Sequence, residues 1–227
     1  MNILNISFSA IIFLSILFFQ STNNSLFENP QSNIEMVIDT IISFEKSVLR
    51  EKPEKWFLAR TGKGEICDWE IENDNGNKVL VQLSKQKIDY RFNLIINNSL
   101  RTKNIEMQVS LKAISGKMDQ GGGLVWRYQD ENNYYVVRAN PLENNFRVYK
   151  VVNGNRIELN SANIELDSKQ WYIIKIRMQE NHIKCYLNGN IMLDVFDNTI
   201  TNSGKVGFWT KSDAVTYFDN LCITNAL

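Results

Sequence analysis

The sequence predicts an all-β protein: an antiparallel sandwich of two sheets with a short hydrophobic segment at its N-terminus. From Trp56 onward, apolar and polar residues alternate with a period of two, which is the pattern of half-buried strands. Asn, Gly and Asp clusters interrupt this alternation at intervals of about 8 to 12 residues, as expected in a sandwich. Aromatic residues make up 11% of the chain, which suits pleated and half-buried surfaces.

Residues 1–22 are predicted to be a signal peptide or an N-terminal hydrophobic anchor. The run from Ile6 to Phe19 is apolar apart from serines, and polar residues follow it. It is shorter than the roughly 20 residues that a membrane-spanning helix needs, and it suits the core of an export signal. No Lys or Arg precedes Lys46 and no A-x-A cleavage site is present, so an uncleaved anchor is the alternative. We therefore expect a secreted or periplasmic protein that contacts a membrane only through this segment, if it is uncleaved.

Residues 23–54 are predicted to be a linker with a leading strand. Part of this stretch, residues 33–52, fits either one helical face or an edge strand, because the β-branched cluster VIDTIISF favours extended backbone. We expect a strand near residues 41–45. Residues 55–227 are then the sandwich domain.

Within that domain the strands follow one another between polar turns. The motif LNGN at 187–190 is the strongest hairpin signal, since Asn-Gly tolerates positive φ at both turn positions. No repeat of 20–50 residues is visible, which argues against a propeller or a solenoid. The predicted strands are 66–72, 78–84, 89–96, 105–114, 123–128, 133–139, 146–152, 171–178, 182–188, 191–196, 205–211 and 214–224.

The hairpin GLVWRYQDENNYYVVRA carries two arginines among core-type residues. A loop over 129–132 would place Trp126 opposite Tyr135, and alternation then divides the side chains between two faces. The wholly apolar and aromatic set is expected to face the core, and the set that mixes Arg with Tyr is expected to face water and ligand. The first set is Leu124, Trp126, Tyr128, Tyr135 and Val137, and the second is Val125, Arg127, Tyr134, Val136 and Arg138.

Several segments together resemble a known family. GGGLVWRYQDENNYYVVRANPLENNFRVYKVVNG, WYIIKIRM, CYLNGNIML and GKVGFWTKSDAVTYFDNL look like the concanavalin A-like, laminin-G-like jelly rolls. They are most similar to the secreted bacterial domains called 3-keto-disaccharide hydrolase-like, over roughly residues 55–225. The resemblance implies a two-sheet sandwich with a concave face and a sugar-related role. It does not by itself assign an activity.

Catalytic motifs are missing from the sequence. Laminarinase-like jelly rolls carry E-x-D-x-x-E on one strand, whereas the nearest acids here, Glu165 and Asp167, lie in an expected turn. The single histidine, His182, is expected at a strand end, and neither a nucleophile elbow nor a C-x-x-C motif is present. Lys plus Arg and Asp plus Glu are 25 each, which argues against a nucleic-acid partner.

We therefore predict a secreted carbohydrate-binding module that binds a glycan or small saccharide as a monomer. The alternatives are a glycoside hydrolase or lyase acting on (3-keto-)disaccharides and a surface protein-interaction domain. The predicted sugar-binding residues are Arg127, Tyr134, Arg138 and Trp209, since rings stack on sugars and guanidinium groups bind hydroxyls. Alternatively these side chains complete a half-buried sheet, with the arginines paired to acids.

Cofactors are not expected, with one exception. Related laminin-G-like sandwiches hold a structural calcium ion, and Asp219 resembles a position that serves this purpose. The alternative is that Asp219 accepts backbone hydrogen bonds at a bulge.

Overall fold

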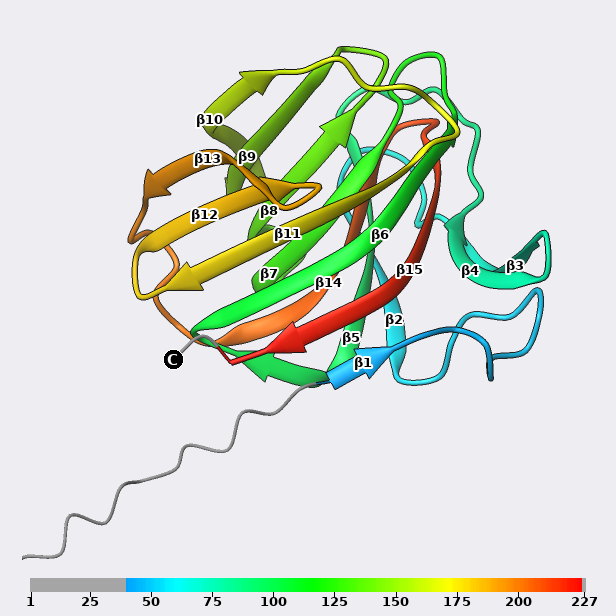
Figure 1. Cartoon of the computed structure of the whole chain (residues 1–227), viewed down its shortest axis with the longest axis horizontal. Helices are drawn as coiled ribbons and strands as arrows, with labels where there is room; N and C mark the ends of the chain where they lie inside the picture. Colours follow the sequence, from blue (N-terminus) through cyan, green and yellow to red (C-terminus); the bar gives the residue numbers. More distant parts are fainter. Residues whose placement is uncertain (1–39, 226–227) are drawn as a thin grey trace, which may run out of the picture. The chain divides into compact units, whose positions relative to one another are not determined.

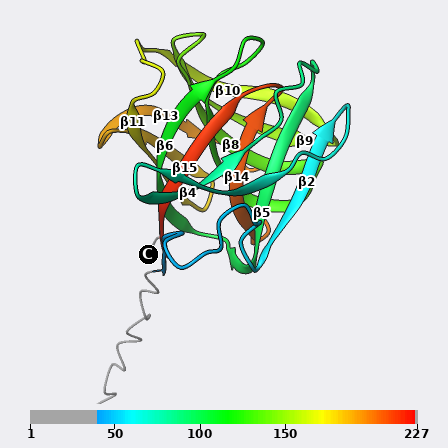
Figure 2. The same cartoon turned by 90° about the vertical axis from the view of Figure 1, so that its right-hand side faces the viewer.

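The computed structural model describes residues 40–225, and the expected N-terminal signal segment lies outside them. The described residues contain no helix, and therefore none that could cross a membrane. They form two antiparallel sheets that lie face to face (Figures 1 and 2), which confirms the predicted fold class. The strands are β1 (Thr40–Ile42), β2 (Trp56–Gly62), β3 (Trp69–Asp74), β4 (Asn77–Gln82), β5 (Arg91–Thr102), β6 (Ile105–Ser115), β7 (Gly122–Asp130), β8 (Asn133–Asn140), β9 (Asn145–Val152), β10 (Asn155–Asn163), β11 (Trp171–Gln179), β12 (His182–Leu187), β13 (Asn190–Phe196), β14 (Gly204–Lys211) and β15 (Val215–Thr224).

One sheet has the order β13-β12-β11-β6-β15-β4-β3, with β1 paired to β15, and the other has the order β10-β9-β8-β7-β14-β5-β2. The leading strand expected near 41–45 is β1, which is shorter than expected and begins at Thr40. The sequence prediction omitted β2 and β10. These two are the edge strands of the seven-stranded sheet, where one side of the strand has no partner and polar residues are tolerated.

The main hydrophobic core lies between the sheets. Trp126 of β7 stacks on Tyr135 of β8, with ring centroids 5.5 Å apart, and both rings are fully buried. The face assignment of the hairpin is therefore correct for four of the five expected core residues. Leu124, Trp126, Tyr135 and Val137 all belong to this core.

The fifth residue, Tyr128, was placed on the wrong face. Arg127 has φ of 45°, and the β7–β8 register shifts between Trp126 and Asp130. This bulge breaks the alternation, because one extra residue reverses the side on which the next side chain lies. Tyr128 consequently packs on the outer face of the sheet, beside Tyr134.

The glycines before this bulge allow a close backbone approach at the start of β7. A Cβ atom at Gly123 would lie 1.6 Å from the carbonyl oxygen of Val137 on β8. Only glycine allows the two strands to approach this closely.

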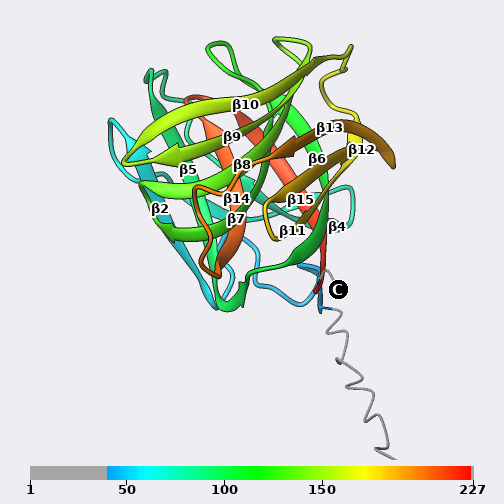
Figure 3. The ribbon, with the colours of Figure 1, turned by 90° about the vertical axis from the view of Figure 1, so that its left-hand side faces the viewer.

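The outer face of the seven-stranded sheet is concave because the sheet is strongly curled (Figure 3), and two hydrogen-bonded contacts join distant parts of the sheet. Tyr90, just before β5, donates a hydrogen bond from its hydroxyl to the carbonyl of Gly154 in the β9–β10 turn, at 2.9 Å. The second contact is a hydrogen bond that the hydroxyl of Thr61 on β2 donates to the carbonyl of Glu131 in the β7–β8 turn. A second apolar cluster fills the space inside this curl. Its buried members are Ala59, Phe92, Leu94, Ile96, Val125, Tyr128, Tyr134, Val136, Tyr149, Val151 and Trp209.

Candidate functional site

The four predicted sugar-binding residues are buried. Tyr134 and Trp209 have exposed fractions of 0%, Arg127 of 1% and Arg138 of 2%. The expectation that they line a sheet face open to water is therefore wrong. Trp209 lies on the outer side of the sheet, and its neighbour Phe208 lies in the main core.

Tyr134 and Trp209 belong to the second cluster. The hydroxyl of Tyr134 lies 2.8 Å from that of Thr61, and burial raises the pKa of Tyr134 far above its usual value. Trp209 packs on Phe92 at 5.3 Å between ring centroids. The guanidinium of Arg156 lies 4.8 Å from the Phe92 ring and 5.8 Å from the Trp209 ring, so the side chain covers the aromatic centre of the concave face.

Arg127 does not point over the concave face. Its guanidinium donates to three backbone carbonyls: Lys103 at 3.0 Å, Ile200 at 2.7 Å and Glu180 at 2.6 Å. Burial lowers its pKa from the usual value. The side chain therefore joins three connections at one end of the sandwich.

Arg138 is the centre of a series of alternating charges on the concave face, called here the charge ladder. Its Nη2 donates to Glu143 at 2.7 Å, and its Nη1 lies 3.7 Å from Asp119. Burial raises the pKa of Asp119. For Glu143 burial also opposes ionisation, but hydrogen bonds from Arg138 and Asn145 outweigh it and lower the pKa to about 2. In order along the face, the ladder is Lys211, Asp119, Arg138, Glu143, Arg147 and Glu158.

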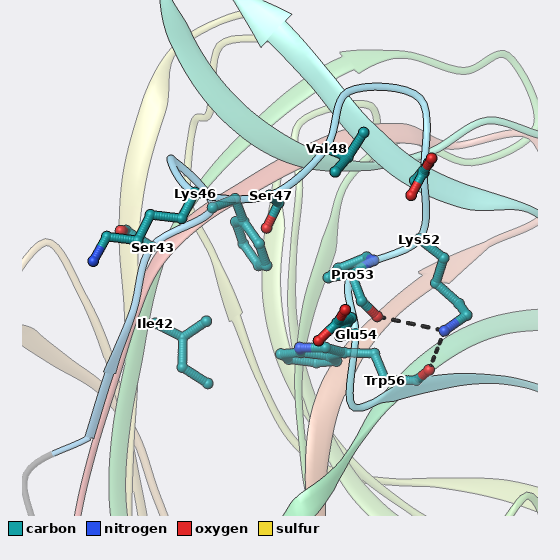
Figure 4. A pocket seen from close by; sticks show the side chains of 11 residues that line it. Ile42, Ser43, Lys46, Ser47, Val48, Lys52, Pro53, Glu54 and Trp56 are labelled. Carbon is teal, nitrogen blue, oxygen red and sulfur yellow. Dashed lines mark hydrogen bonds between the residues drawn. The ribbon is translucent and has the colours of Figure 1, made fainter.

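Since the predicted residues are enclosed, the open sites lie elsewhere, and one of them is a hollow of about 330 Å³ beside Trp56, called the Trp56 hollow (Figure 4). The connections before and after Arg50 form its two walls. Apolar side chains and charged or hydroxyl side chains both line it. The residues are Ile42, Ser43, Phe44, Lys46, Ser47, Val48, Glu51, Lys52, Pro53, Glu54 and Trp56.

The floor of the Trp56 hollow is rigid. The indole of Trp56 stacks on Phe208 of the main core, with centroids 5.2 Å apart and planes 16° apart. Phe44 packs against the same indole at 6.4 Å. Lys52 donates from its ammonium group to the carbonyl of Trp56 at 2.5 Å, as Figure 4 shows, and this bond holds the loop around Pro53.

Both walls are also tied to the eight-stranded sheet. The ammonium of Lys78 donates to the carbonyl of Ser47 at 2.7 Å. The backbone of Ile71 bonds to both Arg50 and Glu51, at 2.8 and 3.0 Å. Between residues 40 and 225, Lys46, Glu51 and Glu54 form no ion pair, so their charged groups are available to a ligand.

A shallower depression of about 400 Å³ lies on the other side of Trp56. Lys55, Phe57, Asn98 and Lys205 line it together with Trp56. The ammonium of Lys205 lies 4.7 Å from the Phe57 ring and donates to Asn98 at 2.6 Å. Sequence reasoning missed both hollows. The available signal was EKPEKW at 51–56, an aromatic residue that follows closely spaced charges.

Comparison with known proteins places the chain in a family. Residues 51–224 match the family of the 3-keto-alpha-glucoside-1,2-lyase-like domain. The chain belongs to this family. No curated protein matches the sequence.

Solved structures share the fold of this 3-keto-alpha-glucoside-1,2-lyase-like domain. The carbohydrate-binding module CBM66 from Bacillus subtilis is 17% identical, with a TM-score of 0.62 over 75% of this chain and 96% of that chain. Domain 4 of the extracellular arabinanase AbnA from Geobacillus stearothermophilus, solved with arabinotriose, is 12% identical, with a TM-score of 0.55 over 82% and 91% of the two chains. The jelly-roll architecture inferred from the resemblance is thus confirmed.

The match to the 3-keto-alpha-glucoside-1,2-lyase-like domain begins at residue 51. The wall of the Trp56 hollow from Ile42 to Val48 therefore precedes the matched region, whereas Glu51 to Trp56 lie within it. Six of the eleven lining residues of the hollow therefore lie outside the family match.

Asp219, the residue considered for calcium, is 3% exposed, and donors surround its carboxylate. Asn77 donates to it at 3.0 Å, and the backbone N–H of Asn220 donates at 2.7 Å. The β15–β6 register shifts between Asp219 and Cys222, so the residue lies at a bulge. Within residues 40–225, no group of three or more His, Cys, Asp or Glu side chains could hold a metal ion. Calcium binding at Asp219 stays a prediction.

Proposed function

We propose that the protein is a carbohydrate-binding jelly-roll module and that the Trp56 hollow is its binding site. The observation that carries this is the lining of the hollow, in which an indole floor and apolar walls are combined with unpaired carboxylate and ammonium groups. Saccharides have apolar C–H faces that pack on rings and hydroxyls that need donors and acceptors. A volume of about 330 Å³ lies at the lower end of the range for ligand sites, which suits a mono- or disaccharide unit.

The charges that line the hollow favour an uncharged saccharide. Lys46 and Lys52 are balanced by Glu51 and Glu54, so the site has no net charge. The arabinotriose bound to domain 4 of AbnA is a neutral sugar, which supports the same choice. The predicted export segment, together with the extracellular arabinanase among the similar structures, supports a secreted or periplasmic location.

The test is a glycan array followed by calorimetry with the saccharide that binds. Trp56 belongs to the core, so the variant is Glu51→Gln with Glu54→Gln, which removes two acceptor charges from exposed positions. We expect at least about tenfold weaker binding, since a hydrogen bond to a charged group contributes roughly 1.5–3 kcal/mol. The matched control is Glu165→Gln with Asp167→Asn, two exposed acids elsewhere, which should bind as the wild type does. Equal affinity of all three proteins would contradict the assignment of the site.

A second candidate function is lyase activity on 3-keto-glucosides, and one observation favours it. His182 is the single histidine of the chain, and its Nε2 lies 2.6 Å from the carboxylate of Asp194 beside a small hollow lined by Arg177 and Lys184. In an elimination, a base removes the C2 proton that the C3 ketone acidifies. The C1=C2 double bond then forms, and the C1 oxygen leaves with a proton. His182 is the candidate base, and the neighbouring cations would stabilise the enolate oxygen.

This candidate is tested by incubating the protein with a 3-keto-glucoside and following the unsaturated product by mass spectrometry. Turnover that His182→Asn abolishes would establish the lyase. The absence of product with the wild-type protein would reject it.

A further inference from the structure

Three lysines and one aspartate line a single hollow at one end of the sandwich, although the whole chain has no net charge. The connection between β4 and β5 and the connection between β6 and β7 lie on either side of a hollow of about 270 Å³, called the lysine hollow. Strand β2 starts at Trp56 and ends at Gly62, which pairs with Arg91 near this end. The lysine hollow thus lies at the end of β2 opposite to the Trp56 hollow. Its lining residues are Lys85, Lys87, Ser115, Gly116, Lys117 and Asp213.

The acid that lines this hollow does not pair with the lysines. The carboxylate of Asp213 accepts hydrogen bonds from the backbone N–H groups of Lys117, Met118 and Asp119, at 2.8 to 3.0 Å. These bonds outweigh burial and lower the pKa of Asp213 below its usual value. The side chain therefore orders the β6–β7 connection, and the hollow keeps a net charge of two positive units from three lysines and one aspartate.

The three lysines have no ion-pair partner within residues 40–225. Other acids also lie at this end: Asp89 follows Lys87 by two residues and accepts a hydrogen bond from the backbone of Tyr90, and Glu65 and Asp68 line the adjacent hollow that shares Lys85, but within residues 40–225 none of them forms an ion pair with these lysines. Asp119 is occupied by Lys211 and Arg138. The ammonium groups of Lys85, Lys87 and Lys117 are consequently available to an anion.

The backbone that carries Lys85 and Lys87 is held in place by a buried arginine. Arg91 is 1% exposed, and it donates to Ser84 at 2.8 Å, to the carbonyl of Gln86 at 3.0 Å and to the carbonyl of Ser212 at 3.1 Å. Both connections are therefore fixed to the same turn, since Asp213 follows Ser212. The Nε of Arg91 is buried and has no hydrogen-bond partner among residues 40–225, and Arg91 also lines the adjacent polar hollow. The arrangement is preorganised for an anion, which reduces the entropy cost of binding.

We infer that the lysine hollow binds an anionic group of a polysaccharide, a carboxylate or a sulfate ester. This rests on the proposed function for the choice of a saccharide. A concave site that three ammonium groups line fits one charged group, whereas a lipid surface or a nucleic acid would need a broad basic face. The second site would give the module affinity for acidic glycans in addition to the neutral unit in the Trp56 hollow.

The experiment measures affinity by calorimetry for polygalacturonate, dextran sulfate and neutral dextran. The variant Lys85→Gln, Lys87→Gln, Lys117→Gln should bind at least one acidic polymer about tenfold more weakly or worse. The control Arg101→Gln, Lys103→Gln, Lys169→Gln removes the same charge from exposed positions elsewhere and should change affinity less than about threefold. The polymer that responds distinguishes carboxylate from sulfate.

Several outcomes would overturn the inference: no acidic polymer binds, both triple variants lose affinity equally, or anionic phosphatidylserine vesicles bind at the lysine hollow and the polymers do not. The same measurements distinguish a failure of this inference from a failure of the proposed function. Glu51→Gln with Glu54→Gln should weaken binding of the neutral saccharide alone, and the lysine variant should weaken binding of the acidic polymer alone. Loss of one effect with retention of the other identifies which site is wrong.

Discussion

The inner face of the seven-stranded sheet packs against the other sheet, whereas turns of the same curled sheet and the side chain of Arg156 enclose its outer face. The inner face is almost wholly apolar. The outer face has an aromatic centre beneath Arg156 and a charge ladder at one end. A concave sheet face is thus not a binding groove when its own strands and turns fill it, and open hollows then occur at the ends of the strands.

The largest expected effect tests whether the outer cluster is as much a core as the inner one. Trp209 and Phe208 are neighbours on β14, and both are fully buried on opposite faces. We expect Trp209→Ala and Phe208→Ala each to lower the free energy of unfolding by about 3–5 kcal/mol. Urea denaturation measures both. A loss below about 1 kcal/mol for Trp209→Ala would show that the outer face is open in solution.

Arg138→Ala should have the next largest effect. Arg138 is an ion-pair partner of Asp119, and Asp119 is only 1% exposed. Breaking a buried ion pair costs about 3–5 kcal/mol. In the variant Lys211 still pairs with Asp119, so we expect the free energy of unfolding to fall by about 3 kcal/mol, the lower end of this range. Thermal or urea unfolding measures the loss. Arg147→Ala is the matched control, since its side chain is 31% exposed and contacts the same Glu143. It should cost less than about 1 kcal/mol.

Tyr134→Phe addresses the contact that closes the curl. The hydroxyl of Thr61 donates to Glu131, so the hydroxyl of Tyr134 donates to Thr61. Loss of this one buried hydrogen bond should lower the free energy of unfolding by about 1 kcal/mol. Hydrogen exchange should show faster opening of β2 than of β6. Unchanged exchange in β2 would mean that this contact does not hold the edge.

The smallest expected effect is the loss of stability on acidification, when Glu143 of the charge ladder becomes protonated. Glu143 has a folded-state pKa of about 2, below the usual value of 4.5, so its contribution to stability is complete above pH 4.5 and is lost as the pH falls toward 2. Its side chain is 37% exposed, so solvent screening keeps the contribution below about 1 kcal/mol. Glu143→Gln should remove this part of the pH dependence between pH 4.5 and 2. If stability depends on pH in the same way in the variant and the wild type, Glu143 does not contribute to stability through the charge ladder.

Local pattern was enough to predict the strands with strong alternation and the side on which most of their side chains lie. Trp126 and Tyr135 lie in the core as predicted, and the LNGN turn between β12 and β13 has Asn188 and Gly189 at positive φ. Tyr128 was misplaced because a bulge has no reliable signature in one sequence. The edge strands β2 and β10 were not predicted, although the edge strands β3 and β13 of the other sheet were, because β2 begins with three successive apolar residues and β10 is mostly polar, so neither shows the alternation of a half-buried strand.

Period-two alternation and local turn chemistry, which act over a few residues, predict the all-β class and the face on which most side chains lie, and the sequence motifs of the hairpins indicate the family. Whether the outer face meets water was not predictable from these local patterns. That depends on contacts between residues 64 and 70 positions apart, from Tyr90 to Gly154 and from Thr61 to Glu131. Alternation specifies a side of a strand, but the curvature of the whole sheet determines whether that side is exposed, so the arginines and rings expected at the surface are enclosed.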